Sequence, residues 1–145
     1  YGNSTGISTA SDWKPGFAAA IWFDGSLSRQ GLAEGGIIQS VPSGRTFTMW
    51  RYSMSMINGT KGNPSWFGDL VGDWREEVLM RTQDNKALRL YISTIPTHYR
   101  FHTFMHDPVY RISVATQNVA YNQPTQPGFY IGPELKGHFR GTYIK

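Results

Sequence analysis

The sequence predicts an all-β protein, because both its composition and its pattern of short apolar segments favour strands over helices. The 145 residues include 16 Gly and 8 Pro, and only 17% of them are charged. Gly and Pro favour tight turns and weaken helices, so this balance is typical of many short strands joined by turns. Apolar residues make up 39% of the chain and aromatic residues 14%, which is enough for a buried core.

Nine candidate strands follow one another at spacings of about ten residues. The first is the apolar run of residues 17–23, which ends at Asp24-Gly25. No segment shows a convincing helical period. The other candidates are bounded by Gly, Pro, Asp or Asn, and they comprise residues 37–41, 46–52, 77–82, 87–93, 99–104, 110–115, 129–131 and 141–144.

The clearest supersecondary unit is a hairpin, in which residues 77–82 and 87–93 flank the turn residues Asp84-Asn85. Along its second strand apolar and more polar side chains alternate, which predicts a half-buried strand. The alternating apolar residues are Leu88, Leu90 and Ile92.

Nine short strands fit a β-sandwich, a barrel or the blades of a β-propeller, and periodicity does not choose among these architectures. A four-stranded blade takes about 40 to 50 residues, so a propeller chain of this length would hold about three blades. Since a closed propeller needs at least about four blades, the other blades would have to be supplied from elsewhere.

The distribution of charge excludes some partners. The formal net charge is +4, but the Lys and Arg residues are scattered singly. A nucleic-acid-binding stripe or a polybasic membrane patch would cluster them, so we expect neither nucleic acid nor membrane as a partner. The charge fits a mildly basic surface or attraction to an acidic polysaccharide. There is no Cys, which excludes disulfides, and no apolar run approaches the roughly 20 residues of a membrane span.

Three acids at relative positions one, five and nine precede a predicted strand and resemble a calcium loop. They are Asp69, Asp73 and Glu77. Calcium prefers oxygen ligands, and the backbone carbonyl of Arg75 could complete such a site, although Val71 offers no side-chain oxygen at position three. The alternative is a metal-free turn in which Asp73 and Glu77 accept hydrogen bonds from backbone amides. Both readings remain open from the spacing alone.

Several ordered blocks of the sequence resemble the rhamnogalacturonan lyases of polysaccharide lyase family 11. The similarity covers about residues 17–132. The blocks are residues 21–25 with Arg29, 58–61, 68–78, 81–82, 87–89, 94–97, 105–108, 110–111 and 117–124.

This resemblance implies an eight-bladed β-propeller with calcium bound among its blades, of which the chain would supply the C-terminal part. Residues 1–16 would form a polar N-terminal segment and residues 17–145 the closing blades. The remaining blades would come from a second chain, a cleaved segment or other residues of a longer polypeptide. The implied activity is cleavage of the rhamnose–galacturonate backbone of pectin by β-elimination, in a secreted, extracellular enzyme that would be inactive without the missing blades.

The resemblance also assigns roles to individual residues. Lys61 matches the family's lysine that contacts the substrate carboxylate, and it is the candidate catalytic residue. The residues that match its presenting loop and the sugar-binding block are Asn58, Gly59, Thr60, Asn118, Tyr121 and Asn122. Without the family, Lys61 would be an exposed turn lysine and Tyr121 a packing aromatic.

Two other functions compete with the lyase. A carbohydrate-binding propeller segment without catalysis would keep Tyr121 and the asparagines for sugar recognition, and a calcium-stabilised adhesion propeller would use only the acid spacing. Endo or exo action, the exact uronate and the identity of the base stay open. His98, His102 and His106 would stand too far apart along a strand to bind one metal ion, and Trp66 and Trp74 are expected to pack.

Overall fold

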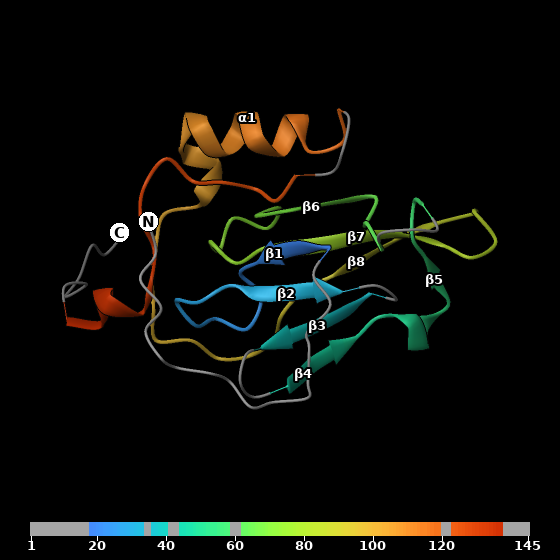
Figure 1. Cartoon of the computed structure of the whole chain (residues 1–145), viewed down its shortest axis with the longest axis horizontal. Helices are drawn as coiled ribbons and strands as arrows, with labels where there is room; N and C mark the ends of the chain where they lie inside the picture. The colour runs from blue at the N-terminus through green and yellow to red at the C-terminus, as the bar shows by residue number, and fades with distance from the viewer. Residues whose placement is uncertain (1–17, 34–35, 41–43, 59–61, 120–122, 138–145) are drawn as a thin grey trace, which may run out of the picture.

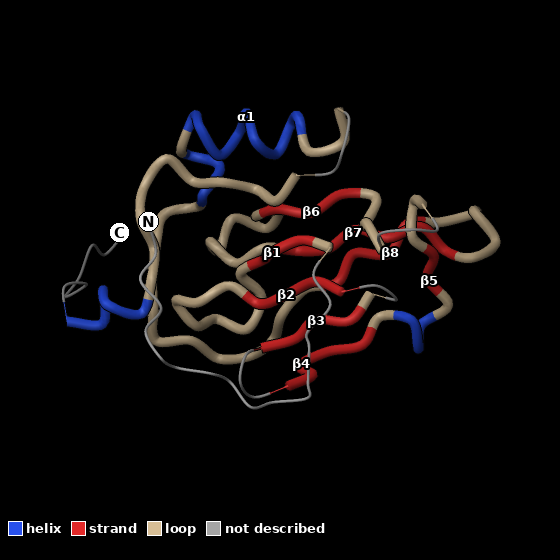
Figure 2. Tube along the Cα trace, viewed as in Figure 1, coloured by secondary structure: helices blue, strands red, loops and turns tan. Residues whose placement is uncertain are grey.

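A computed structural model describes residues 18–33, 36–40, 44–58, 62–119 and 123–137. These residues form two four-stranded antiparallel sheets, a single α-helix and three short 3-10 helices (Figure 1, Figure 2). The expectation of a mainly β protein is therefore confirmed.

The first sheet is a meander whose strands lie in sequence order. Each strand pairs antiparallel with the next, and the register shifts once, between Ile38 and Gln39. Its strands are β1 (Ala19–Ile21), β2 (Gln30–Ala33), β3 (Ile37–Ser40) and β4 (Gly44–Thr48).

The second sheet is built around its longest strand, β7 (Glu77–Thr82). On one side, the C-terminal end of β7 pairs with β5 (Met54–Ser55), and its N-terminal half pairs with β6 (Trp66–Gly68). On the other side it pairs with β8 (Leu88–Tyr91), so that the predicted hairpin is confirmed. The turn of this hairpin contains Asn85, which has a positive φ of 58°.

One core joins the two sheets. Side chains of both sheets belong to a single buried cluster, which burial of apolar surface stabilises. Fully buried members are Ile21, Leu32 and Ile38 from the first sheet and Phe67, Val78 and Met80 from the second.

A second core lies between the second sheet and the C-terminal half of the chain. It contains Phe104 and the inner face of helix α1 (Pro108–Thr116), which turns Tyr110 and Val114 inward. Trp74 belongs to it, and Trp66 packs against it, so the expectation that these two tryptophans pack is confirmed.

Helix α1 corrects the prediction of a strand over residues 110–115. Asp107 caps its N-terminus by accepting a hydrogen bond from the amide of Val109 at 3.0 Å, and Pro108 occupies the first turn. An Asp-Pro pair is a helix-start signal. The β-branched residues Ile112 and Val114 favour a strand locally. The Asp107 cap and the burial of Tyr110 and Val114, four residues apart on one face, stabilise a helix instead.

Other predicted strands also differ from the structure. Residues 99–104 and 129–131 are not strands. The last residue of the first range begins a 3-10 helix, Phe104–His106. Three strands were not predicted, namely β2, β5 and β6. Their two to four residues are too short for a periodicity to be recognised. Residues 141–144 lie outside the described residues.

The expected count of about three blades is not confirmed. Within the part of the chain that the structure describes, there are two four-stranded sheets, and residues 94–137 form loops and helices rather than a third. The segment after β8 returns to the loop between β1 and β2, where the hydroxyl of Thr97 donates to the carbonyl of Gly25 at 2.6 Å. This contact ties the segment to the end of the first sheet.

Candidate functional site

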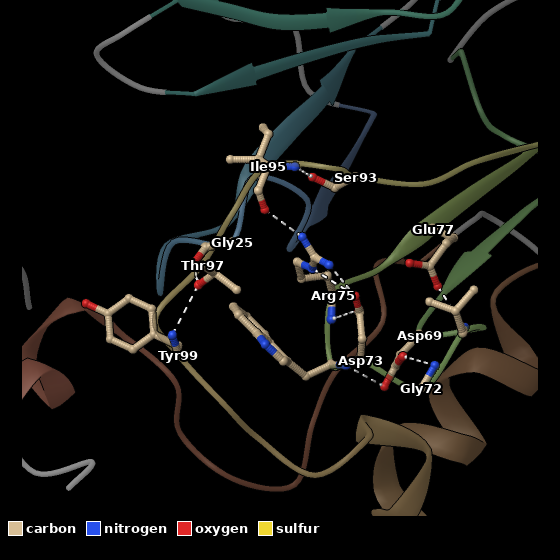
Figure 3. A network of polar contacts seen from close by, with 12 residues as sticks. Gly25, Asp69, Gly72, Asp73, Arg75, Glu77, Ser93, Ile95, Thr97 and Tyr99 are labelled. Carbon is tan, nitrogen blue, oxygen red and sulfur yellow. Dashed lines mark hydrogen bonds and ion pairs between the residues drawn. The ribbon is translucent and has the colours of Figure 1, made fainter. Parts of the chain in front are cut away.

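The loop between β6 and β7 and the first residue of β7 carry the three acids of the predicted calcium motif (Figure 3). Asp69 follows β6 directly and is 1% exposed. One of its carboxylate oxygens accepts from the amide of Gly72 at 2.8 Å, and the other accepts from the Thr103 hydroxyl at 2.7 Å and the Phe104 amide at 2.8 Å. Gly72 has a positive φ of 80°, a conformation that favours glycine. Asp69 thus folds the loop and ties it to residues 103–104.

Asp73 is paired within the same loop. Its carboxylate accepts from the amide of Arg75 at 3.1 Å and forms an ion pair with the Arg75 guanidinium. The guanidinium also donates to the carbonyl of Ile95 at 2.8 Å, which links the loop to the segment after β8 (Figure 3). Asp73 and Arg75 therefore act as one planar pair at the rim of the loop.

Glu77, the third acid, begins β7 and is 1% exposed. One carboxylate oxygen accepts from the amides of Leu70 at 2.7 Å and Val71 at 3.0 Å. Burial disfavours the charged carboxylate and raises the pKa of Glu77 to about 7, and the negative charges of Asp73 and Asp69 add to this effect. The two amides oppose the shift because they stabilise the ionised form.

These contacts decide how far the three acids suit a calcium ion. Each carboxylate already accepts protein donors, and in the described residues no group of three or more His, Cys, Asp or Glu side chains is arranged to hold a metal. As placed, the loop has the hydrogen bonds of the metal-free alternative. A calcium ion would have to displace some of these donors, so we derive no catalytic step through calcium.

The raised pKa of Glu77 predicts a pH-dependent stability. Its folded-state pKa of about 7 lies above the ordinary value of 4.5, so its contribution is fully present below about pH 4.5 and is lost as the pH rises through 7. At about 1.4 kcal/mol per pKa unit, the loss is on the order of 3 kcal/mol. Glu77→Gln keeps an oxygen for the two amides but cannot ionise, so the variant should gain stability relative to wild type over this range. Urea denaturation at several pH values measures the difference, and parallel profiles for the two proteins would contradict the prediction.

A second polar cluster was not predicted, and it is centred on Glu76. This residue is fully buried, and its carboxylate accepts from the Trp22 amide at 2.9 Å, the Tyr110 hydroxyl at 2.6 Å and the Thr125 hydroxyl. The Tyr110 oxygen in turn accepts from the amide of Asp69 at 2.9 Å. Burial raises the pKa of Glu76, although these hydrogen bonds oppose the shift. The cluster joins the first sheet, the second sheet, α1 and the C-terminal segment.

Arg29, in the loop between β1 and β2, completes this cluster. Its guanidinium donates to the carbonyl of Thr125 and lies over the Trp22 ring, 3.9 Å from the centroid. Such stacking on an aromatic face suits a partly desolvated guanidinium. The charge of Glu76 favours the protonated form of Arg29, while burial, the larger effect, lowers its pKa. The sequence offered one signal for the cluster: two adjacent acids, Glu76 and Glu77, at the start of an otherwise apolar strand.

The predicted substrate residues are only partly described. Gly59, Thr60, Lys61, Tyr121 and Asn122 lie outside the described residues. Asn58 and Asn118 are both exposed at the borders of those segments.

The described residues beside the two segments are neighbours. The side-chain amide of Asn118 donates to the carbonyl of Ser65 at 2.9 Å. The amide of Ile57 donates to the carbonyl of Asn63 at 3.1 Å, which closes the loop that follows β5. Gln117 fixes the end of α1 to β6, because its side chain bonds both the amide and the carbonyl of Phe67.

The histidines are arranged differently from the expectation. The rings of His102 and His106 stack with centroids 5.9 Å apart, because the chain turns into a 3-10 helix between them. The expectation that the histidines stand too far apart along a strand is therefore wrong for His102 and His106.

Helices that could span a membrane are not found in the described ranges, since none combines the necessary length and hydropathy.

Comparison with known proteins identifies the class. The model of the C-terminal domain of family 11 rhamnogalacturonan lyases matches residues 2–140, which extends beyond the stretch in which the sequence blocks were recognised. The chain therefore belongs to this family of polysaccharide lyases.

Curated relatives agree with this assignment. The chain is 48% identical over 114 residues to rhamnogalacturonan endolyase YesW of Bacillus subtilis, covering 77% of the chain and 18% of the relative. It is 43% identical over 136 residues to rhamnogalacturonan exolyase YesX of the same organism, covering 81% of the chain and 21% of the relative. The chain thus spans about a fifth of the length of these relatives.

Solved structures share the fold. The crystal structure of YesW superposes with a TM-score of 0.73 at 45% identity, over 79% of this chain and 20% of that one. A family 11 rhamnogalacturonan lyase of Bacillus licheniformis superposes with a TM-score of 0.72 at 43% identity, over 78% of this chain and 20% of that one.

Proposed function

We propose that the chain is part of a lyase that cleaves the rhamnose–galacturonate backbone of rhamnogalacturonan by β-elimination. The observation that carries the proposal is the family match over residues 2–140, together with relatives named for endolytic and exolytic cleavage of this polymer. The substrate, an acidic pectic polysaccharide, suits the net charge of +4.

The proposed chemistry starts at the uronate. A base removes the proton at C5, a double bond forms between C4 and C5, and the C4–O bond breaks, so that the leaving oxygen takes up a proton. A positive charge near the carboxylate stabilises the charge that develops in the transition state. Lys61 is the proposed cation in its protonated form; the alternative is that Lys61 with a lowered pKa is neutral and acts as the base. Asn58, Gly59 and Thr60 would present it, while Asn118, Tyr121 and Asn122 would hold the sugar ring.

The contacts of flanking residues support a single site. The hydrogen bond from Asn118 to Ser65 brings the segment after α1 to the segment before β6. Ser65 follows the loop with the proposed lysine, and Asn118 precedes the proposed Tyr121.

Calcium is proposed as a structural ion of Asp69, Asp73 and Glu77, without a catalytic role. Binding would favour the ionised form of Glu77 and so oppose the effect of its burial. Calcium should then raise the melting temperature of the wild type more than that of Glu77→Gln or Asp73→Asn. The melting temperature of each protein is compared in calcium and in chelator. An equal rise in all three proteins would contradict the proposal that calcium binds in this loop.

We further propose that the two sheets are blades of a larger propeller whose other blades lie outside this chain. Exposed apolar side chains along β8 and just after it support this: Leu88 is 61% exposed and Leu90 45% exposed in the strand, and Ile92, which follows it, is 51% exposed. The alternation predicted that these apolar side chains form the buried face of the strand, which is wrong, because they are exposed and Tyr91 and Ser93 are buried instead. A neighbouring blade would cover the three apolar side chains. An extracellular location is proposed because a long polysaccharide is reached most directly outside the cell.

Replacement of Lys61 tests the proposal. Lys61→Ala in the protein completed with its remaining blades should lower the rate of rhamnogalacturonan cleavage by about 10²- to 10⁴-fold, because a charge-stabilising or proton-transferring group is lost. The ultraviolet absorbance of the unsaturated uronate measures the rate. Lys86→Ala is the matched control, since Lys86 is exposed in the β7–β8 turn and should leave the rate unchanged.

The outcomes separate lyase from binding module. A completed wild-type protein that binds the polymer without producing absorbance would favour a non-catalytic carbohydrate-binding propeller segment. Equal rates for Lys61→Ala and wild type would contradict the role of Lys61.

A further inference from the structure

A cavity of about 570 Å³ opens between residues 100–108 and residues 128–129. Its size is within the usual range for small-molecule sites. None of its lining residues belongs to the proposed substrate segments or to the acid loop.

The apolar part of the cavity is aromatic and held in place. Phe129 remains 44% exposed, yet its ring packs edge-to-face on the fully buried Phe104, with centroids 5.8 Å apart. Phe101 lines the same cavity and packs edge-to-face on Trp74, with centroids 5.0 Å apart. Two fixed aromatic rings offer faces and edges to the C–H surface of a sugar ring.

The polar part of the cavity is basic. Arg100, His102 and His106 line it, and all three are exposed. Asp107 is the acidic residue of the lining, but its carboxylate is committed to the amides of Val109 and Gly128. The groups left to meet a ligand are therefore cations or potential cations, and they complement an anion.

We propose that this cavity is a binding site for a single uronic acid residue, separate from the cleavage site. The sugar carboxylate would meet the Arg100 guanidinium, whose planar fork matches a carboxylate, and the C–H face of the ring would rest on Phe129. The histidines would donate to ring hydroxyls or to the carboxylate. In rhamnogalacturonan such a site would hold a galacturonate unit of the polymer.

Titration with monosaccharides tests this inference. The assay uses the full chain in a Lys61→Ala background, so that the cation of the proposed cleavage site does not contribute, and amide chemical shifts separate the two sites by residue. D-galacturonate should shift the amides of residues 100–108 and 128–129 and bind at least about tenfold more tightly than D-galactose, in which a neutral hydroxymethyl group replaces the carboxylate.

Two variants and a control locate the site. Arg100→Gln should weaken galacturonate binding about tenfold, and Phe129→Leu should weaken it several-fold, whereas Arg89→Gln on the exposed strand β8 should not change it. Equal affinities for galacturonate and galactose, or an unchanged affinity in Arg100→Gln, would overturn the inference. Inorganic phosphate that binds as tightly as galacturonate, with no effect of Phe129→Leu, would show a simple anion site and would also overturn it.

The result is independent of the proposed cleavage. Galacturonate binding that depends on Arg100, together with no cleavage of rhamnogalacturonan by the completed wild-type protein, would support the binding site while contradicting the lyase. Cleavage of rhamnogalacturonan by a protein that does not bind galacturonate in this cavity would support the lyase and contradict the binding site.

Discussion

Glu76→Ala should lower the free energy of unfolding by about 3–5 kcal/mol, the largest loss expected from a polar substitution in this chain. The carboxylate accepts from the Trp22 amide and from the hydroxyls of Tyr110 and Thr125. Its removal leaves three buried donors without this acceptor and deprives Arg29 of the nearby negative charge that favours its protonated form. Four segments of the fold meet at this one side chain.

Two further variants keep this prediction testable if Glu76→Ala does not fold. Glu76→Gln retains an acceptor and the side-chain shape, so it should lose clearly less stability than the alanine variant. Tyr110→Phe removes the hydroxyl that joins Glu76 to the Asp69 amide and should cost about 1–3 kcal/mol. Urea denaturation monitored by circular dichroism gives these values. A loss below about 1 kcal/mol in Glu76→Ala would mean that the cluster does not stabilise the fold.

Phe104→Ala should also cost about 3–5 kcal/mol, because it opens a cavity in the second core. Phe104 is fully buried and contacts several aromatic rings edge-on. Its ring centroid lies 5.2 Å from that of Trp22 and 5.3 Å from that of Tyr110. Loss of this ring would loosen both the capped start of α1 and the loop that Asp69 holds to residues 103–104.

A matched control comes from the same helix region. Ile112 lies on the outer face of α1 and is 65% exposed, so Ile112→Ala should change stability by less than about 0.5 kcal/mol. Phe104→Leu keeps most of the side-chain volume, so its loss of stability should lie between those of Phe104→Ala and Ile112→Ala. Equal losses for Phe104→Ala and Ile112→Ala, measured by denaturation, would contradict the assignment of Phe104 to a stabilising core.

The sequence predicts best where a local signal and the tertiary structure agree. The strand over residues 77–82 was recognised with its bounds, because the apolar residues 78–80 are followed by a turn with Asp84-Asn85. Helix α1 was missed because its Val and Ile residues favour strands locally, whereas the Asp107 cap and the burial of Tyr110 and Val114 are realised only in the fold.

The candidate site shows the same limit. Spacing alone identified Asp69, Asp73 and Glu77 as a structured loop, but not whether their oxygens bind a metal or the loop's own amides. The Glu76 cluster was not predictable from spacing, because its partners Trp22, Tyr110 and Thr125 lie 34 to 54 residues away in the sequence. Contacts over such distances follow from the packing of the two sheets and α1.

The eliminative mechanism is tested most directly by cleavage in water enriched in heavy oxygen. β-Elimination breaks the C4–O bond without consuming water, whereas hydrolysis adds one water molecule at each cut. We expect the protein completed with its remaining blades to release unsaturated products that, sampled before the new reducing end exchanges its oxygen with water, carry no heavy oxygen from the solvent, as read by mass spectrometry. Saturated products that contain one heavy oxygen per cut would show hydrolysis and would contradict the proposal that this chain is part of a lyase.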